Sequence, residues 1–255
     1  MIRTVARGEF LDFVQSSTRE FMDSIADLDV YIVKKFYEPE RVLAIRDFAA
    51  RLAKSQPPSW HPCLDGVPDY HRVNDEYERS WVRGKLHGFY FHYFNDNRWI
   101  LEQFKDLLEL KNGLRGAEKD ADYTSLPSAG VISRVVSQHY PRGGGYLSEH
   151  VDPASDFAMI QTIIQASTPG RDFSEGGLYF RASEEAEPVY LDGGTEPGDL
   201  IVLTPNVRHG VAPIDPSARL DWELETGRWM VLPIILRSDY NMDPATKPRQ
   251  IAASS

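Results

Sequence analysis

The chain has 255 residues, enough for one domain with a full core, and 38 Asp and Glu against 28 Lys and Arg give it a formal net charge of −10. Nucleic-acid binding relies on clustered basic residues, and the longest basic run is Lys34-Lys35, so no nucleic-acid partner is expected. No apolar run approaches the ~20 residues that span a bilayer, and no signal-peptide pattern is seen, which predicts a cytoplasmic protein without a membrane partner. A single cysteine, Cys63, excludes an intrachain disulfide.

The first half of the chain predicts helical support. Residues 29–36 form a short β-rich run, after which Glu38-Pro39-Glu40 starts a helix that continues with helical apolar spacing up to Pro57. A second helix is predicted over about residues 97–110, ending at Asn112-Gly113. Both apolar stripes are typical of core packing, and residues 1–130 are interpreted as a support for the second half of the chain.

Between these helices, residues 59–95 are dense in aromatic residues and histidine. One interpretation is an irregular, partly buried segment that covers the core. The other is a lid over a substrate site, since long loops without regular structure are often functional.

From Val131 the pattern changes to short strands separated by Gly, Pro and Asp, which indicates a sandwich or barrel. Pro233, inside the last run, predicts an edge position or a bulge. We therefore expect one domain, with a β core over residues 131–238 and a loose tail over 239–255. The eight predicted strands are 131–140, 147–151, 158–167, 178–180, 189–191, 200–203, 209–211 and 228–236.

Three residues of this β region point to metal chemistry. A strand places residues i and i+2 on one face, so His150 and Asp152 can reach one ion, and His209 can reach it from another strand. Two imidazoles and one carboxylate on one side of an ion form the facial arrangement of non-heme Fe(II) oxygenases. His-x-acid alone is weak, since roughly one such match is expected by chance in this composition. Its position among strands and Gly turns gives it weight.

Residues 131–238 resemble the double-stranded β-helix core of the 2-oxoglutarate- and Fe(II)-dependent oxygenases. The resemblance implies a mainly β fold with α support, in which N-terminal helices accompany a jelly-roll or cupin-like core. The order and spacing of the matching segments are specific, although each is short. The segments are Gln138-His139-Tyr140-Pro141, His150-Val151-Asp152, Gly198-Asp199-Leu200, His209-Gly210-Val211 and Gly227-Arg228.

The resemblance implies that His150, Asp152 and His209 are the catalytic metal ligands for Fe(II), with 2-oxoglutarate and O2 as co-substrates. The implied reaction is hydroxylation of a small molecule. A halogenase of this family typically has Gly or Ala in place of the carboxylate, so Asp152 disfavours halogenation.

The resemblance also implies that an arginine holds the distal carboxylate of 2-oxoglutarate, for which the planar guanidinium is suited. Arg228 opens the final apolar strand, 19 residues after His209, and is preferred. Arg219 is the rival: its spacing of 10 residues from His209 is closer to the commonest one in the family, but it lies in what is interpreted as an inserted loop. Met230 stands where some members carry a serine that shares the carboxylate.

Arg134, Gln138 and Tyr140 fall on one face of the strand over residues 131–140. Polar groups on a buried face need partners, and a bound co-substrate could supply them, although an outward solvated face is an equal alternative for Arg134. Tyr140 also matches a tyrosine that many relatives place near 2-oxoglutarate.

Two rival functions stay open at this point. One is a cupin-like metalloenzyme that does not use 2-oxoglutarate, which usually brings three histidines. The other is a catalytically silent binding protein on the same fold. The sequence leaves open the identity of the substrate, the choice among hydroxylation, desaturation and cyclisation, and the oligomeric state.

Overall fold

The structure is a computed structural model that describes residues 1–240 apart from 78, 79, 81, 153 and 154. Among the described residues the helices are α1 (Arg7–Ser16), α2 (Thr18–Ala26), α3 (Pro39–Ser55), α4 (Trp99–Glu102), α5 (Lys105–Leu114) and the 3-10 turn η1 (Pro127–Ala129). The strands are β1 (Ile2–Ala6), β2 (Val30–Lys34), β3 (Tyr70–Asp75), β4 (Gly84–His92), β5 (Val131–Tyr140), β6 (Gly145–His150), β7 (Gln161–Gln165), β8 (Gly177–Arg181), β9 (Val189–Tyr190), β10 (Leu200–Leu203), β11 (Arg208–Ile214) and β12 (Arg228–Arg237).

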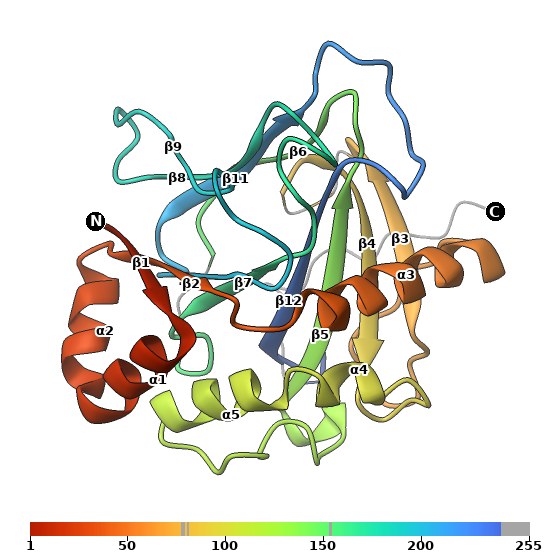
Figure 1. The fold of residues 1–255 in the computed structure, drawn as a ribbon. Helices are drawn as coiled ribbons and strands as arrows, with labels where there is room; N and C mark the ends of the chain where they lie inside the picture. The colour runs from red at the N-terminus through yellow and green to blue at the C-terminus, as the bar shows by residue number, and fades with distance from the viewer. Residues whose placement is uncertain (78–79, 81, 153–154, 241–255) are drawn as a thin grey trace.

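The strands pair in the order β1-β2-β10-β7-β12-β5-β4-β6-β11-β8-β9, with β3 on the other side of β4. The path folds over at the short β4–β6 junction, where Gly84 pairs with Leu147. A larger sheet that contains β5, β7, β10 and β12 then faces a smaller one of β6, β11, β8 and β9 (Figure 1). Apolar side chains from both sheets, including Val136, Ile163 and Val211, are buried together between them. The fold is a double-stranded β-helix of the jelly-roll type.

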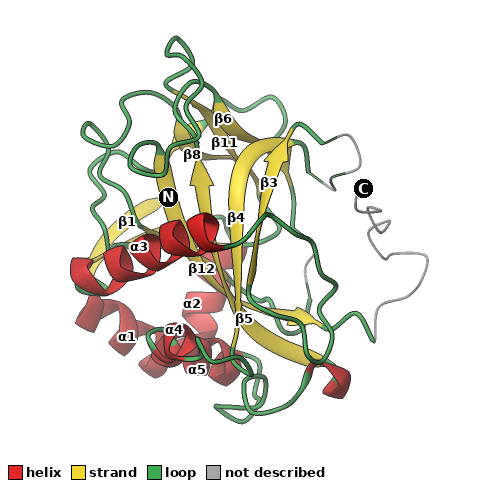
Figure 2. Cartoon of the chain, turned by 90° about the vertical axis from the view of Figure 1, so that its right-hand side faces the viewer, coloured by secondary structure: helices red, strands yellow, loops and turns green. Residues whose placement is uncertain are grey.

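A second apolar core lies between the outer face of the larger sheet and the helices. Helix α3 begins with Pro39 at its first turn and buries one stripe that includes Val42 and Ile45. This stripe belongs to the same cluster as Phe89 of β4 and Val231 of β12. Figure 2 shows α3 lying along the sheet, with the other helices below it. The helices therefore stiffen the larger sheet from behind and leave its inner face to the barrel.

The predicted helix over residues 38–57 is confirmed as α3, but the one over 97–110 is only partly right. The structure divides it into α4 and α5, with a break at Gln103-Phe104, and α5 continues through Asn112-Gly113 to Leu114. Asn112 is buried inside the helix and donates from Nδ2 to the backbone carbonyl of Lys119 at 2.8 Å. This hydrogen bond helps to keep Asn112 within the helix, although an Asn-Gly pair usually ends one.

The interpretation of residues 59–95 as an irregular segment holds only for residues 59–69 and parts of the stretch between the strands. Strands β3 and β4 occupy much of the segment and pair in an antiparallel ladder from Tyr70↔Tyr90 to Asp75↔Lys85. Strand β4 in turn pairs with β5 from His87↔His139 to His92↔Arg134. This segment is therefore an extension of the larger sheet rather than a loop laid over it. Residues 78, 79 and 81 within it lie outside the described part.

All eight strands predicted after Val131 are confirmed, with end shifts of a few residues, and β5 and β10 have the predicted bounds. Pro233 lies within the β12–β5 ladder opposite Val135. The β12–β7 ladder among the described residues covers only Met230 and Val231, so the missing N–H of Pro233 faces no strand on that side. Most of the expected loose tail, residues 241–255, falls outside the described residues.

None of the helices in the described part of the chain combines the length and the apolar character that a membrane crossing requires.

Candidate metal centre and cavity

The three predicted metal ligands come together in the structure. His150 ends β6, His209 lies near the start of β11, and the two are direct partners in the β6–β11 ladder. Asp152 follows β6 and places Oδ1 3.6 Å from His150 Nε2 and Oδ2 3.5 Å from His209 Nε2. One donor atom from each residue lies within 4.8 Å of the other two. This donor set could hold one divalent ion.

Backbone carbonyls fix both imidazole rings. His150 Nδ1 lies 2.9 Å from the carbonyl oxygen of Ser148, and His209 Nδ1 lies 2.8 Å from that of Val207. Each Nδ1 therefore carries the hydrogen and donates it, which leaves Nε2 as the lone-pair atom on the side of Asp152. Such outer hydrogen bonds select the tautomer and ring orientation that a metal ligand needs.

Burial and the nearby carboxylate act in opposite directions on these rings. Burial, aided by the neighbouring His209, lowers the pKa of His150. Burial also lowers the pKa of His209, but Asp152 and the backbone carbonyl of Val207 together outweigh this and leave that pKa raised. Asp152 is itself oriented by Gln161, whose Nε2 donates to Oδ2 at 3.2 Å. The carboxylate is thus fixed between two imidazoles.

The three residues open onto a cavity of about 660 Å³ inside the barrel. This is the size range of small-molecule sites, which run from roughly 300 to 1,000 Å³. The walls come from both sheets and from the aromatic segment over residues 59–95. Among the lining residues are Trp60, His61, Tyr70, Arg72, Tyr90, Arg134, Val136, Gln138, Phe157, Ile163, Leu178, Val211, Met230, Leu232, Ile234 and Arg237. The aromatic segment over residues 59–95 therefore supplies a wall of the same cavity that contains the triad.

Arg228 lies just beneath this cavity and is fully buried. Its Nε and Nη2 donate to the two carboxylate oxygens of Asp192, at 2.6 and 2.9 Å. Asp192 also accepts hydrogen bonds from Gln165 Nε2 at 3.1 Å and from the backbone N–H of Leu178 at 2.8 Å. The remaining nitrogen of Arg228, Nη1, is buried and has no hydrogen-bond partner among the described residues.

Tyr140 pairs with Arg228 across the β5–β12 ladder, and its ring centroid lies 5.7 Å from the guanidinium carbon. Its hydroxyl donates to Gln138 Oε1 at 2.7 Å. The next pair on the same face, Gln138 with Met230, lines the cavity. Arg228 and Tyr140 thus form the layer below the cavity floor.

Arg134 lies at the other end of the same strand face and lines the cavity, whereas Arg219 is exposed in the loop between β11 and β12. The backbone of Arg219 packs on the turn at Gly143, which has φ +84° and no room for a Cβ. Arg219 is not among the residues that line the cavity.

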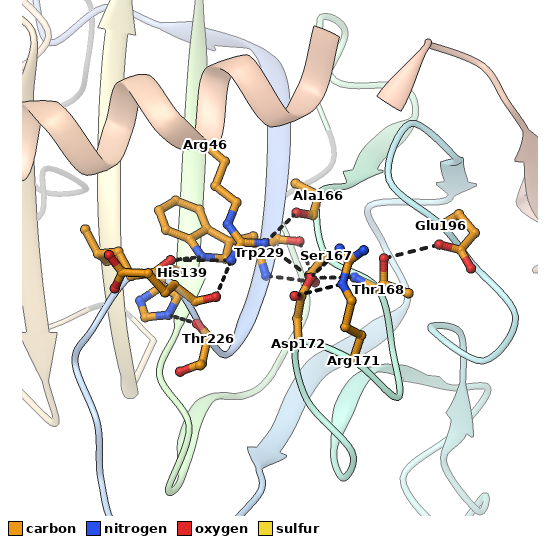
Figure 3. Close-up of polar contacts among 12 residues, drawn as sticks. Arg46, His139, Ala166, Ser167, Thr168, Arg171, Asp172, Glu196, Thr226 and Trp229 are labelled. Atoms are coloured by element: carbon orange, nitrogen blue, oxygen red, sulfur yellow. Dashed lines mark hydrogen bonds and ion pairs between the residues drawn. The ribbon is translucent and has the colours of Figure 1, made fainter. Parts of the chain in front are cut away.

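A polar cluster outside the barrel holds the segment that leads into β12. Arg46 of α3 donates to Asp172 at 3.2 Å, and its guanidinium lies 5.6 Å from the ring centre of Trp229. His139 Nε2 bonds the backbone carbonyl of Thr226 at 2.7 Å (Figure 3). Thr226 and Trp229, which make these contacts, lie on either side of Arg228 in the sequence. The contacts therefore fix the backbone from which the Arg228 side chain enters the barrel.

The sequence does not single out Arg72 or Gln161, and it offers Tyr70 and Tyr90 only as members of the aromatic segment. The signal for Tyr70, Arg72 and Tyr90 is period-two alternation within 70–74 and 86–92, which the density of aromatic residues conceals. Gln161 opens a strand that was predicted to begin three residues earlier.

No protein-family model matches the chain, and no curated protein matches its sequence. Solved structures do resemble it. A full-length Neurospora crassa protein, in complex with alpha-KG and thymine, is 11% identical with a TM-score of 0.55 over 92% of this chain and 86% of that one. A 2OG-Fe(II) oxygenase family protein from Caulobacter crescentus is 12% identical with a TM-score of 0.51 over 93% and 87%. At these identities the likeness concerns the fold, and the chain has the double-stranded β-helix fold of 2OG-Fe(II) oxygenase structures.

Proposed function

We propose that the chain is an Fe(II)- and 2-oxoglutarate-dependent dioxygenase that hydroxylates a small molecule. One observation carries the proposal. The Nε2 atoms of His150 and His209 and the carboxylate of Asp152 converge at the wall of a cavity inside the barrel that is large enough for a co-substrate and a small substrate. The fold resembles that of the Neurospora crassa protein, which was crystallised with alpha-KG, the same compound as 2-oxoglutarate.

The donor set fits iron. Two neutral imidazoles and one carboxylate are the ligands of the facial triad of non-heme Fe(II) oxygenases. Within the described residues this group contains two histidines, whereas the cupin-like alternative usually brings three. When bound, Fe(II) would supply the oxidising chemistry with 2-oxoglutarate and O2. The chain's own residues would hold the ion, orient both organic molecules and exclude water.

Arg228 and Tyr140 fit the distal carboxylate of 2-oxoglutarate. Arg228 keeps one buried N–H donor, Nη1, without a partner among the described residues, and a buried donor of this kind normally has one. Asp192 holds the other edge of the guanidinium and so fixes its direction. Tyr140 would rotate its hydroxyl from Gln138 toward the carboxylate. The co-substrate would then extend from the triad down to the layer below Gln138 and Met230.

The test is a binding experiment followed by an activity screen. Purified protein should bind one Fe(II) per chain under anaerobic conditions, and 2-oxoglutarate should then produce a weak visible metal-to-ligand band. With O2 and candidate metabolites, the protein should release succinate in a substrate-dependent way.

Folded His150→Ala and His209→Ala variants should lose the iron and the band, while His61→Ala, in the same cavity but outside the triad, should keep the iron. Retention of full iron by both triad variants would exclude the metal site. Iron binding without any response to 2-oxoglutarate would favour the cupin-like alternative.

A further inference from the structure

Arg134 lies in the cavity wall and Arg228 lies beneath the floor, and one co-substrate cannot reach both. Arg134 and Tyr140 lie on the same face of β5, six residues apart, which corresponds to roughly 20 Å along a strand. The two carboxyl carbons of 2-oxoglutarate are only about 5 Å apart, given carbon–carbon bonds of about 1.5 Å. If the co-substrate reaches Arg228 and Tyr140 at one end, Arg134 is left for another ligand.

Among the described residues, the charge of Asp239 acts on Arg134 without a direct contact. Arg134 makes no hydrogen bond or ion pair there, and its Nε is buried without an acceptor. Its guanidinium carbon lies 5.0 Å from the ring centre of Tyr90, which is a cation–π distance. A guanidinium that is partly withdrawn from water and lacks an acceptor is suited to bind an oxyanion from the cavity.

Arg72 approaches the same ring from β3. Its Nη2 donates to the Tyr90 hydroxyl at 3.3 Å, and no carboxylate of the described residues pairs with it. Tyr90 can lie between the two arginines because of Gly88: a Cβ at Gly88 would stand 2.8 Å from the Tyr90 hydroxyl. Tyr70 stacks on Tyr90 at 4.6 Å and holds the ring in place. The result is a built site in which two guanidinium groups flank one fixed tyrosine.

The charge of this site contrasts with that of the chain. The net charge is −10, yet Arg72, Arg134 and the rim residue Arg237 line the cavity against two carboxylates, Asp152 and Asp239. Asp152 belongs to the metal site. A cationic cleft in an anionic protein concentrates small anions and repels cations, because a cleft with low-dielectric walls focuses the field.

We propose that the cavity binds an anionic small molecule by its oxyanion, a carboxylate or a phosphate, through Arg72 and Arg134 beside Tyr90. The cavity wall beside Arg134 is aliphatic: Ile234 pairs with Arg134 and Leu232 pairs with Val136, and all of them line the cavity. The body of the ligand is therefore apolar where it lies against this wall and extends toward the metal ligands. This ligand would be the substrate of the proposed oxygenase. Its oxidation rests on the proposed function, whereas its binding does not.

The test uses phenylacetate, phenyl phosphate and the neutral phenylacetamide as probes, measured by calorimetry without turnover. Titrations are run on the protein alone and on protein saturated with Mn(II) and 2-oxoglutarate. We expect one or both anions to bind and phenylacetamide to bind about tenfold more weakly or not at all. The tighter of the two anions identifies the oxyanion.

Arg134→Gln and Arg72→Gln should each weaken anion binding about tenfold or more, and Arg134→Lys should retain part of it, because an ammonium keeps the charge but not the fork. The exposed Arg219→Gln is the matched control and should bind as the wild type does. In all variants 2-oxoglutarate binding should be unchanged.

Four outcomes would overturn the inference. Two concern the probes: equal binding of phenylacetamide, or no binding of either anion. Two concern the co-substrate: competition between 2-oxoglutarate and the probe, or loss of 2-oxoglutarate binding in Arg134→Gln, which would make Arg134 a co-substrate residue. The titrations on the protein alone separate this question from the proposed function. A wild type that binds the anions but not Mn(II) with 2-oxoglutarate would refute the oxygenase and leave the oxyanion site standing.

Discussion

Removal of the Arg228 guanidinium should destabilise the folded protein even when no ligand is bound. Arg228 and Asp192 form a fully buried bidentate ion pair, with distances of 2.6 and 2.9 Å. Breaking such a pair from one side leaves an uncompensated buried charge, which costs about 3–5 kcal/mol. For a chain of this length 1 kcal/mol corresponds to about 2–4 °C, so Arg228→Ala should lower the melting temperature by roughly 6–20 °C.

A double-mutant cycle measures this pair. Arg228→Met and Asp192→Leu, singly and together, are compared by urea and thermal unfolding. We expect the double variant to be less destabilised than the sum of the single variants by about 0.5–3 kcal/mol or more, since the second replacement removes the charge that the first left unpaired. Additive effects would refute the reasoning, because they would mean that the two groups do not compensate each other in the folded state.

Three further predictions concern the metal, the co-substrate and the pH dependence of stability. His150→Ala and His209→Ala should remain folded by circular dichroism yet lose stoichiometric iron by metal analysis, and an iron content equal to the wild type would contradict the triad. Tyr140→Phe should keep iron but weaken 2-oxoglutarate binding several-fold in the anaerobic titration, whereas unchanged affinity would place the distal carboxylate elsewhere. Burial lowers the pKa of Lys111 to about 7, from 10.5 in an exposed lysine. The unfolded chain therefore binds the extra proton between about pH 7 and 10.5, so this group makes stability rise with pH over that window. Lys111→Met should flatten the rise in unfolding free energy, and an unchanged slope would count against a buried, titrating lysine.

The sequence predicted the barrel well because its signals are local. Strand β5 and strand β10 were delimited by alternation and turn residues alone, and the Pro-Gly-Asp turn before β10 was recognisable by composition. That turn is then fixed by tertiary contacts: Asp199 accepts hydrogen bonds from Lys35 N at 2.8 Å and from Glu196 N at 2.9 Å. The strands within residues 59–95 were missed because the density of aromatic residues concealed their alternation, and the α4–α5 break was missed because the apolar stripe continues through Phe104.

The residues of the candidate metal site follow a pattern along the chain, whereas those of the proposed oxyanion site do not. His150 and Asp152 are two residues apart, and His209 follows them after a Gly-Asp turn. This order can be recognised from short stretches of sequence. Arg72, Tyr90 and Arg134 share no such pattern, since they come from three strands and meet only through the β3–β4 and β4–β5 ladders. The partner of Arg228 is equally remote, because Asp192 lies 36 residues before it, after a two-residue strand. Spacing along the chain thus predicts the candidate metal ligands, whereas the groups of the proposed oxyanion site are set by register between strands. A one-residue slip of β3 against β4 would turn Arg72 to the outer face and leave the triad intact. The proposed substrate class therefore depends on how the strands pair, which spacing along the chain does not give.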